Sequence, residues 1–117
     1  MMQPLPGYER AVIPIEKFTK YALDSMVEPD KAVAFERALG YTIKNAEELI
    51  ENIRLHLGDF PHKEKGDNGY GMTYEVRMVL TGGNGKRADV ITAWINDTLK
   101  GELRLVSAYV NKRKEGK

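Results

Sequence analysis

The chain has 117 residues, of which 42% are hydrophobic and 30% charged, and its formal net charge is +1. A chain of this length can form one domain with its own core, and this composition is too apolar for a disordered protein. The two halves differ in charge: residues 1–59 contain 7 Lys/Arg against 10 Asp/Glu, net −3, and residues 60–117 contain 11 against 7, net +4. The near-neutral total argues against a protein held on nucleic acid by bulk charge, whereas the basic half suits contact with phosphate.

The chain contains no cysteine, which excludes disulfides, thiolate metal sites and cysteine nucleophiles. Its start, MMQPLPGYER, lacks the charged and apolar blocks of a secretory signal, and no apolar run reaches the roughly 18 residues that span a bilayer. The two histidines, His56 and His62, have no companion at metal-ligand spacing. We therefore expect a soluble, cytoplasmic protein without membrane association, metal or cofactor.

The first half of the chain predicts helices. Residues 1–10 contain prolines and a glycine without periodicity, which indicates a flexible arm that adds little to the core. In AVIPIEKFTKYALD, Pro14 is suited to the first turn of a short helix. The stretch EPDKAVAFERALG predicts a helix that begins at Pro29 or Asp30 and has Gly40 as its left-handed cap.

A further helix follows the link YTIK. We expect Asn45 to cap this helix, with Glu48 as its capping-box partner, and Gly58 to end it. Residues 60–69, FPHKEKGDNG, are polar and rich in turn formers, so they predict a loop.

Beyond this loop the apolar period changes from about 3.6 to 2. MTYEVRMVL alternates as a strand, GGNG at residues 82–85 is a hairpin turn, and ADVITAWI and ELRLVSAYV are strands joined through NDTLKG. This order predicts an α+β fold, in which N-terminal helices pack on a C-terminal antiparallel β-meander of three to four strands. The single domain is expected over residues 11–111, followed by a basic tail, KRKEGK, at residues 112–117.

The last two strands carry polar side chains at every second position. Strict alternation places Ser107 and Tyr109 on one face of their strand, and Thr92 and Trp94 on one face of the preceding strand. If both pairs share a face of the sheet, they form a small concave polar surface. Such residues are also common in ordinary half-buried strands, so the pattern leaves both interpretations open. The role of Lys31 also has two interpretations. A lysine at a helix N-terminus opposes the helix dipole, so it is either an ordinary solvated side chain or a functional one.

Several short motifs occur in a fixed order from about Val12 to Val110. They are IPIEKFTKYAL, DKAVAFERALGY, NAEELIENI, DNGYGMTYEVRMVLTGGNGK, TAWI and LRLVSAYV. This order resembles an uncharacterised bacterial and phage domain family with K-L-x-x-Y-x-L, G-x-K-A-x-x-F, Y-G-x-R-Y, T-x-W-I and L-T-S-x-Y-V motifs. That family occurs alone and at the C-terminus of phage head-associated proteins and polymorphic toxins. Its plan is similar to that of the barnase, EndoU, colicin and RelE group of ribonucleases.

The resemblance implies a metal-independent ribonuclease that acts on RNA such as tRNA. The residues matched to its motifs fall into a catalytic set, Lys31, Ser107 and Tyr109, and a substrate-binding set, Lys17, Tyr21, Tyr74, Thr92 and Trp94. A 2′-hydroxyl would attack the adjacent phosphate while Lys31 stabilises the developing charge. Ser107 and Thr92 would bind phosphate oxygens, Tyr109 would position the substrate or transfer a proton, and Trp94 would stack on a base.

Two departures from the family pattern favour a different class of function. The segment before Lys31 reads SMVEPD, where the family carries H-P and a glycine, and Thr73 replaces the arginine of Y-G-x-R-Y. The matched motifs also supply no convincing general base. The sequence therefore equally supports a non-catalytic protein-interaction module of a prophage or mobile element, with a cognate immunity or phage protein as its partner.

Overall fold

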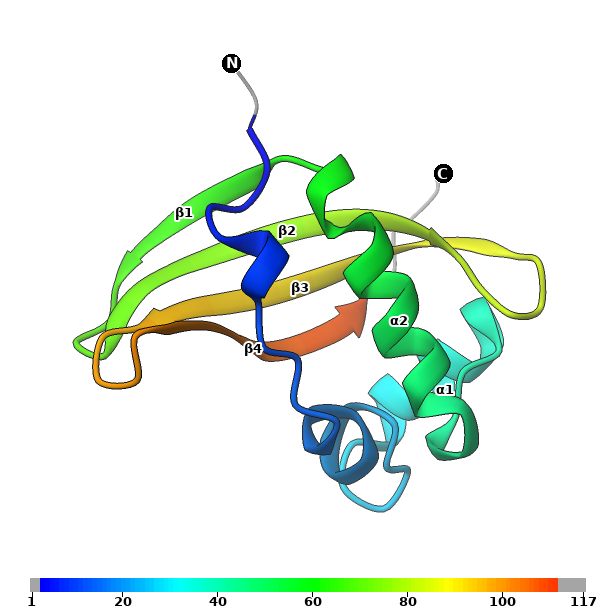
Figure 1. The fold of residues 1–117 in the computed structure, drawn as a ribbon. Helices are drawn as coiled ribbons and strands as arrows, with labels where there is room; N and C mark the ends of the chain where they lie inside the picture. Colours follow the sequence, from blue (N-terminus) through cyan, green and yellow to red (C-terminus); the bar gives the residue numbers. More distant parts are fainter. Residues whose placement is uncertain (1–2, 112–117) are drawn as a thin grey trace.

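The second half of the chain forms a four-stranded antiparallel sheet with the strand order β1-β2-β3-β4 (Figure 1). In the computed structural model, which describes residues 3–111, β1 covers His62–Asp67, β2 Gly71–Thr81, β3 Arg87–Asp97 and β4 Glu102–Val110. The helices precede the sheet in the sequence, so the expected α+β fold with a C-terminal meander is confirmed. Neither of the two α-helices has the length and apolar character that crossing a bilayer requires.

The two α-helices are α1, Pro29–Leu39, and α2, Ala46–His56. α1 begins with a proline in its first turn and ends at Gly40, whose φ of 78° is the left-handed conformation expected of a glycine cap. Asn45 does not cap α2 with its side chain; it forms a capping box with Thr42 around the short 3₁₀ turn Ile43–Asn45, termed η3. The other short turns are η1, Tyr8–Arg10, η2, Phe18–Ala22, which is a π-helix, and η4, Leu57–Asp59.

The core lies between one face of the sheet and the elements that precede it in the sequence, including both α-helices. Figure 1 shows α2 and the N-terminal segment across this face, whereas the region of η2 and α1 lies on the side of β4. Buried side chains of α2, such as Leu49 and Ile53, join buried β2 residues, such as Val76 and Met78, in one cluster. On the other face of β2, every second side chain from Thr73 to Thr81 is exposed or half-buried, and we call this side of the sheet the open face.

Residues 3–10 are not the flexible arm that the sequence predicts. Leu5 has no exposed surface and belongs to the core, and the carbonyl oxygen of Gln3 accepts a hydrogen bond of 2.9 Å from the backbone N–H of His62. One buried leucine and this backbone hydrogen bond hold the segment, although it shows no apolar period. Residues 1–2 and the predicted basic tail at 112–117 lie outside the described residues.

The predicted loop at residues 60–69 contains the strand β1. Its side chains are half-buried at His62 and exposed from there to Asp67, while its backbone pairs with β2. A charged edge strand that is solvated on both sides has no alternation of apolar and polar residues, which is why the sequence pattern failed to reveal it. His62 is held by its Nδ1 atom, 2.9 Å from the Gln3 oxygen, and its ring lies edge-on to Tyr74.

A β-bulge in β4 changes which side chains face the core. Ala93 pairs with Ser107, but Trp94 pairs with Leu105, so Val106 has no partner in β3. Before the bulge Leu103 and Leu105 face the core; beyond it Ala108 does. Ser107 and Tyr109 therefore share a face, as expected, but it is the open face, whereas Thr92 and Trp94 share the core face. The two pairs do not form one polar surface.

Candidate functional site

A small pocket lies beside the second half of β4. The first half of this edge strand is covered by Val12, which exchanges backbone hydrogen bonds with Leu103 and Leu105. Beyond the bulge, the strand borders η2 and the start of α1 instead. The pocket there has a volume of about 120 Å³, and its lining is Lys17, Tyr21, Ala22, Glu28, Lys31, Val106, Ser107 and Ala108. We call it the edge pocket.

Lys17 and Tyr21 reach the edge pocket from one side of η2. Lys17 directly precedes η2 and Tyr21 lies within it, four residues later. This spacing places both side chains on the same helix face, and the Lys17 Nζ atom is 5.9 Å from the centre of the Tyr21 ring. The ring is 50% exposed, so the pair lines the mouth of the pocket rather than the core.

Glu28 and Lys31 come from the beginning of α1. Glu28 is the N-cap residue and Lys31 lies in the first turn, so the two side chains are neighbours at a spacing of three residues. Lys31 Nζ is 3.8 Å from Glu28 Oε2, and both side chains are about one-third exposed. At this distance the ion pair is loose, and both charged groups can also contact a ligand in the pocket.

Ser107 and Tyr109 contribute the β4 side of the site. The bulge at Val106 places both side chains on the open face, and Ser107 is half-buried in the pocket wall. Lys31 Nζ lies 5.8 Å from the centre of the Tyr109 ring, which is 39% exposed. The structure thus brings together five of the residues singled out in the sequence: Lys17, Tyr21, Lys31, Ser107 and Tyr109.

Tyr74, Thr92 and Trp94 do not belong to this group. All three are on the core face, where Tyr74 is 9% exposed and the other two have no exposed surface. The Thr92 hydroxyl donates to the Val76 carbonyl oxygen at 2.8 Å and accepts from Trp94 Nε1 at 2.8 Å. Neither phosphate binding by Thr92 nor base stacking on Trp94 is compatible with this burial, so both expectations are corrected to a structural role.

The site also contains one charged residue that the sequence analysis did not select. Glu28 places a carboxylate in a pocket otherwise lined by lysines, hydroxyls and apolar groups. It lies in SMVEPD, the segment that departs from the resembled family pattern. The sequence does contain a signal that could have identified Glu28. It stands three residues before Lys31 at a helix N-terminus, and this spacing predicts that the two side chains lie together.

No group of three His, Asp or Glu side chains is placed to bind a metal ion within residues 3–111. His56 pairs with Asp59 at 3.1 Å on the surface, and His62 is bound to the N-terminal segment. Neither histidine lines the edge pocket.

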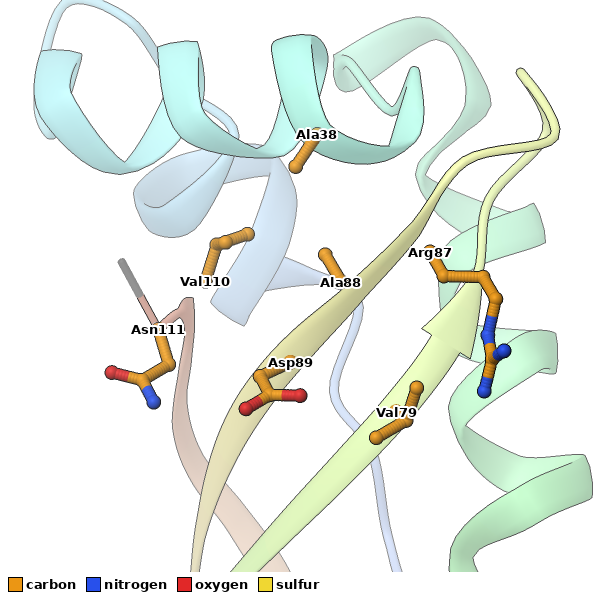
Figure 2. A pocket seen from close by; sticks show the side chains of 7 residues that line it. All are labelled: Ala38, Val79, Arg87, Ala88, Asp89, Val110 and Asn111. Carbon is orange, nitrogen blue, oxygen red and sulfur yellow. The ribbon is translucent and has the colours of Figure 1, made fainter. Parts of the chain in front are cut away.

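A wider hollow of about 620 Å³ lies at the end of the sheet near the C-terminal part of α1 (Figure 2). Ala38 of α1 borders it, and Figure 2 shows Arg87 at the start of β3 and Asn111 just beyond the end of β4. Its charged groups, Arg87 and Asp89, have opposite sign. This hollow contains none of the residues singled out in the sequence, whereas the edge pocket concentrates two lysines.

A comparison with known protein families shows to which family the chain belongs. A family model described as "Domain of unknown function (DUF6883)" matches residues 4–112. The chain belongs to this family. The DUF6883 match includes the whole sheet and every residue of the edge pocket, and it confirms the expectation of an uncharacterised domain family. No curated protein and no solved structure matches the chain significantly.

Proposed function

We propose that the edge pocket binds a phosphodiester group of RNA and cleaves it without a metal ion. The observation that carries this proposal is the convergence of two ammonium groups, a hydroxyl and a carboxylate on one small pocket: Lys17, Lys31, Ser107 and Glu28. The resemblance of the sequence motifs to a phage and toxin family supports a toxin-type ribonuclease domain of such a system.

The pocket has the size and charge for a single phosphate group. Its volume of about 120 Å³ is well below the roughly 300 Å³ at which pockets for drug-sized ligands begin, so it has room for a phosphate group but not for a whole nucleotide. Lys17 and Lys31 supply positive charge, and Ser107 donates a hydrogen bond to a phosphoryl oxygen. The start of α1 adds the positive end of a helix dipole beside the same pocket.

The reaction uses the 2′-hydroxyl of the RNA as its nucleophile. Glu28 accepts the proton of this hydroxyl while the 2′-oxygen forms a bond to phosphorus and the bond to the leaving 5′-oxygen breaks. Lys31 and Lys17 stabilise the charge on the phosphoryl oxygens. Tyr109 donates its phenolic proton to the 5′-oxygen, and the products are a 2′,3′-cyclic phosphate and a free 5′-hydroxyl.

A specific observation favours a second candidate, the non-catalytic interaction module. Met26 and Val27, in the turn between η2 and α1, are 90% and 53% exposed, and Tyr21 nearby in the sequence is 50% exposed. Exposed apolar residues grouped within seven positions are typical of a protein-binding segment. A cognate immunity protein or phage protein would be the partner in this case.

The proposal is tested by cleavage of total RNA and purified tRNA with wild-type protein in the presence of EDTA. Lys31→Met should lower the rate about 10²-fold or more, because it removes a fixed charge at the transition state. Glu28→Gln should lower it by about 10²–10⁴-fold, because it removes the general base. Lys44→Met changes an exposed lysine of η3 outside the edge pocket, and should stay within about twofold of the wild type.

Expression of the same variants in a bacterial host gives a second readout, since an active ribonuclease arrests growth. If folded wild-type protein neither cleaves RNA nor arrests growth, the proposal is contradicted. The non-catalytic interaction module is then the remaining candidate function. If Lys31→Met and Glu28→Gln both cleave RNA as fast as the wild type, the activity belongs to another site.

A further inference from the structure

The edge pocket is too small for a whole nucleotide, so most of a bound RNA must lie outside it. The pocket lies at the edge of the sheet, and two surfaces adjoin it: the turn before α1 and the open face of the sheet. The open face begins at Ser107, which lines the pocket, and continues to Tyr109, whose ring lies beside the ammonium group of Lys31. A polymer that enters the pocket at Ser107 thus meets the open face directly.

A row of side chains crosses the open face from Tyr109. Tyr109 pairs with Ile91 in β3, and Ile91 pairs with Arg77 in β2. Residues opposite each other in neighbouring strands point to the same side of a sheet, so these three side chains form one row. With about 4.8 Å between strands, Arg77 lies roughly 10 Å from Tyr109 across the sheet. Ile91 is buried between them, so the row presents an aromatic ring and a guanidinium group.

The row contains one charged side chain, the cation of Arg77. Arg77 is exposed, and among residues 3–111 its guanidinium has no ion-pair or hydrogen-bond partner. Glu75 and Glu102 of the same face are paired with other cations, Glu75 with Lys65 at 3.7 Å and Glu102 with Arg104. Asp89, which lies diagonally from Arg77 on this face, also has a partner. The cation of the row is therefore available to an anionic ligand, and Lys31 and Lys17 lie at the other end of the row.

We infer that the ligand of this surface is single-stranded RNA that extends beyond the cleaved phosphodiester, with its flanking nucleotides on the row Tyr109–Ile91–Arg77. The inference rests on the proposed function and specifies the substrate of the same site. Arg77 binds a flanking phosphate, and Tyr109 contacts the adjacent sugar or base. A single strand fits because its bases are free to lie on a sheet face and contact an aromatic side chain, whereas a duplex keeps them stacked inside.

The test compares Arg77→Ala with the matched variant Arg10→Ala, which removes an exposed arginine of η1, on the helix side of the sheet. The probe is a fluorescent RNA octamer with 2′-O-methyl groups, which cannot be cleaved through the 2′-oxygen. Arg77→Ala should bind this octamer about tenfold more weakly, as expected for the loss of one charged hydrogen bond, and Arg10→Ala should bind it as the wild type does. Arg77→Lys should recover most of the affinity, because a phosphate accepts either cation.

A kinetic measurement separates this inference from the proposed function. The ratio of kcat/KM for a cleavable octamer to that for a dinucleotide should fall about tenfold in Arg77→Ala and remain constant in Arg10→Ala. Equal octamer affinity of the two arginine variants overturns the inference, even if the wild type cleaves RNA. Equal affinity of the wild type for a duplex of the same sequence overturns the preference for a single strand. If octamer binding depends on Arg77 but the wild-type protein cleaves no RNA, the RNA-binding row is supported and the proposed ribonuclease activity is contradicted.

Discussion

Thr92 is a polar side chain in the middle of the core, and its two hydrogen bonds explain why it is there. Trp94 has no exposed surface, so its indole N–H needs a partner inside the protein. The Thr92 hydroxyl is that partner, and it also donates to the Val76 carbonyl oxygen in the neighbouring strand. One hydroxyl thus satisfies the buried indole N–H and ties the ring to the backbone of the neighbouring strand.

We predict that Thr92→Val destabilises the fold by about 2–3 kcal/mol, because it leaves the fully buried indole N–H of Trp94 without its partner. Thr92→Ser keeps the hydroxyl and loses one methyl group, so it should cost about 1 kcal/mol. Trp94 is the single tryptophan of the chain, and its fluorescence during urea denaturation measures both variants. Equal stability of the two variants would show that the hydroxyl contributes nothing.

At the scale of elements, the placement of α1 depends on the hairpin between β2 and β3. The backbone of Leu39, the last residue of α1, lies directly against Gly82. A Cβ atom at Gly82 would lie 2.6 Å from the Leu39 Cα atom and would overlap its carbonyl oxygen. This contact fixes the C-terminal end of α1, and the other end of the same helix carries Glu28 and Lys31 into the edge pocket.

Gly82→Ala should therefore destabilise the protein by about 1–3 kcal/mol, as overpacking does, because the backbone of Leu39 has to move. Gly83→Ala is the matched control: it lies in the same turn, its added Cβ has no neighbour within 4 Å, and its φ is not positive. We expect that control to be neutral within about 0.5 kcal/mol. Melting temperatures of the two variants provide the measurement, and similar values would refute close packing of α1 on the turn.

The sequence predicted the elements that have strong local signals. Pro29 and Gly40 marked the limits of α1, and alternation together with the glycine turn marked β2 and β3. β1 was missed because a charged edge strand is stabilised by backbone pairing with β2, which leaves no periodic signal in its side chains. The buried Leu5 was missed for the same kind of reason, since a single tertiary contact has no period.

The candidate site was predictable in part. Five residues chosen from motifs lie together, but the bulge at Val106 places Ser107 and Tyr109 on the face opposite to Leu103 and Leu105, where strict alternation would put all four on one face. A bulge depends on how two strands pair, so the sequence of one strand does not reveal it. Without the bulge, Ser107 would face the core beside Leu105 and could not line the edge pocket.

For the whole molecule, positive charge is concentrated locally although the total is only +1. Lys17 and Lys31 belong to the acidic half of the sequence, yet they lie beside Ser107 of the basic half. Folding thus creates a cationic site that the charge count of either half does not indicate. An anionic ligand would be bound by a few specific contacts, and long-range attraction would contribute little.

The salt dependence of RNA binding tests this view of the whole molecule. With one phosphate in the edge pocket and one at Arg77, the logarithm of the association constant should fall with the logarithm of salt concentration with a slope of about −1.4, since each phosphate contact on a single strand contributes about 0.7. Lys31→Met should reduce the magnitude of this slope, whereas Arg10→Ala should leave it unchanged. Titrations of the uncleavable octamer between about 50 and 200 mM salt measure it. A slope of about −4 or steeper would mean that the entire basic half attracts RNA, and a slope near zero would mean that phosphate contacts play no part.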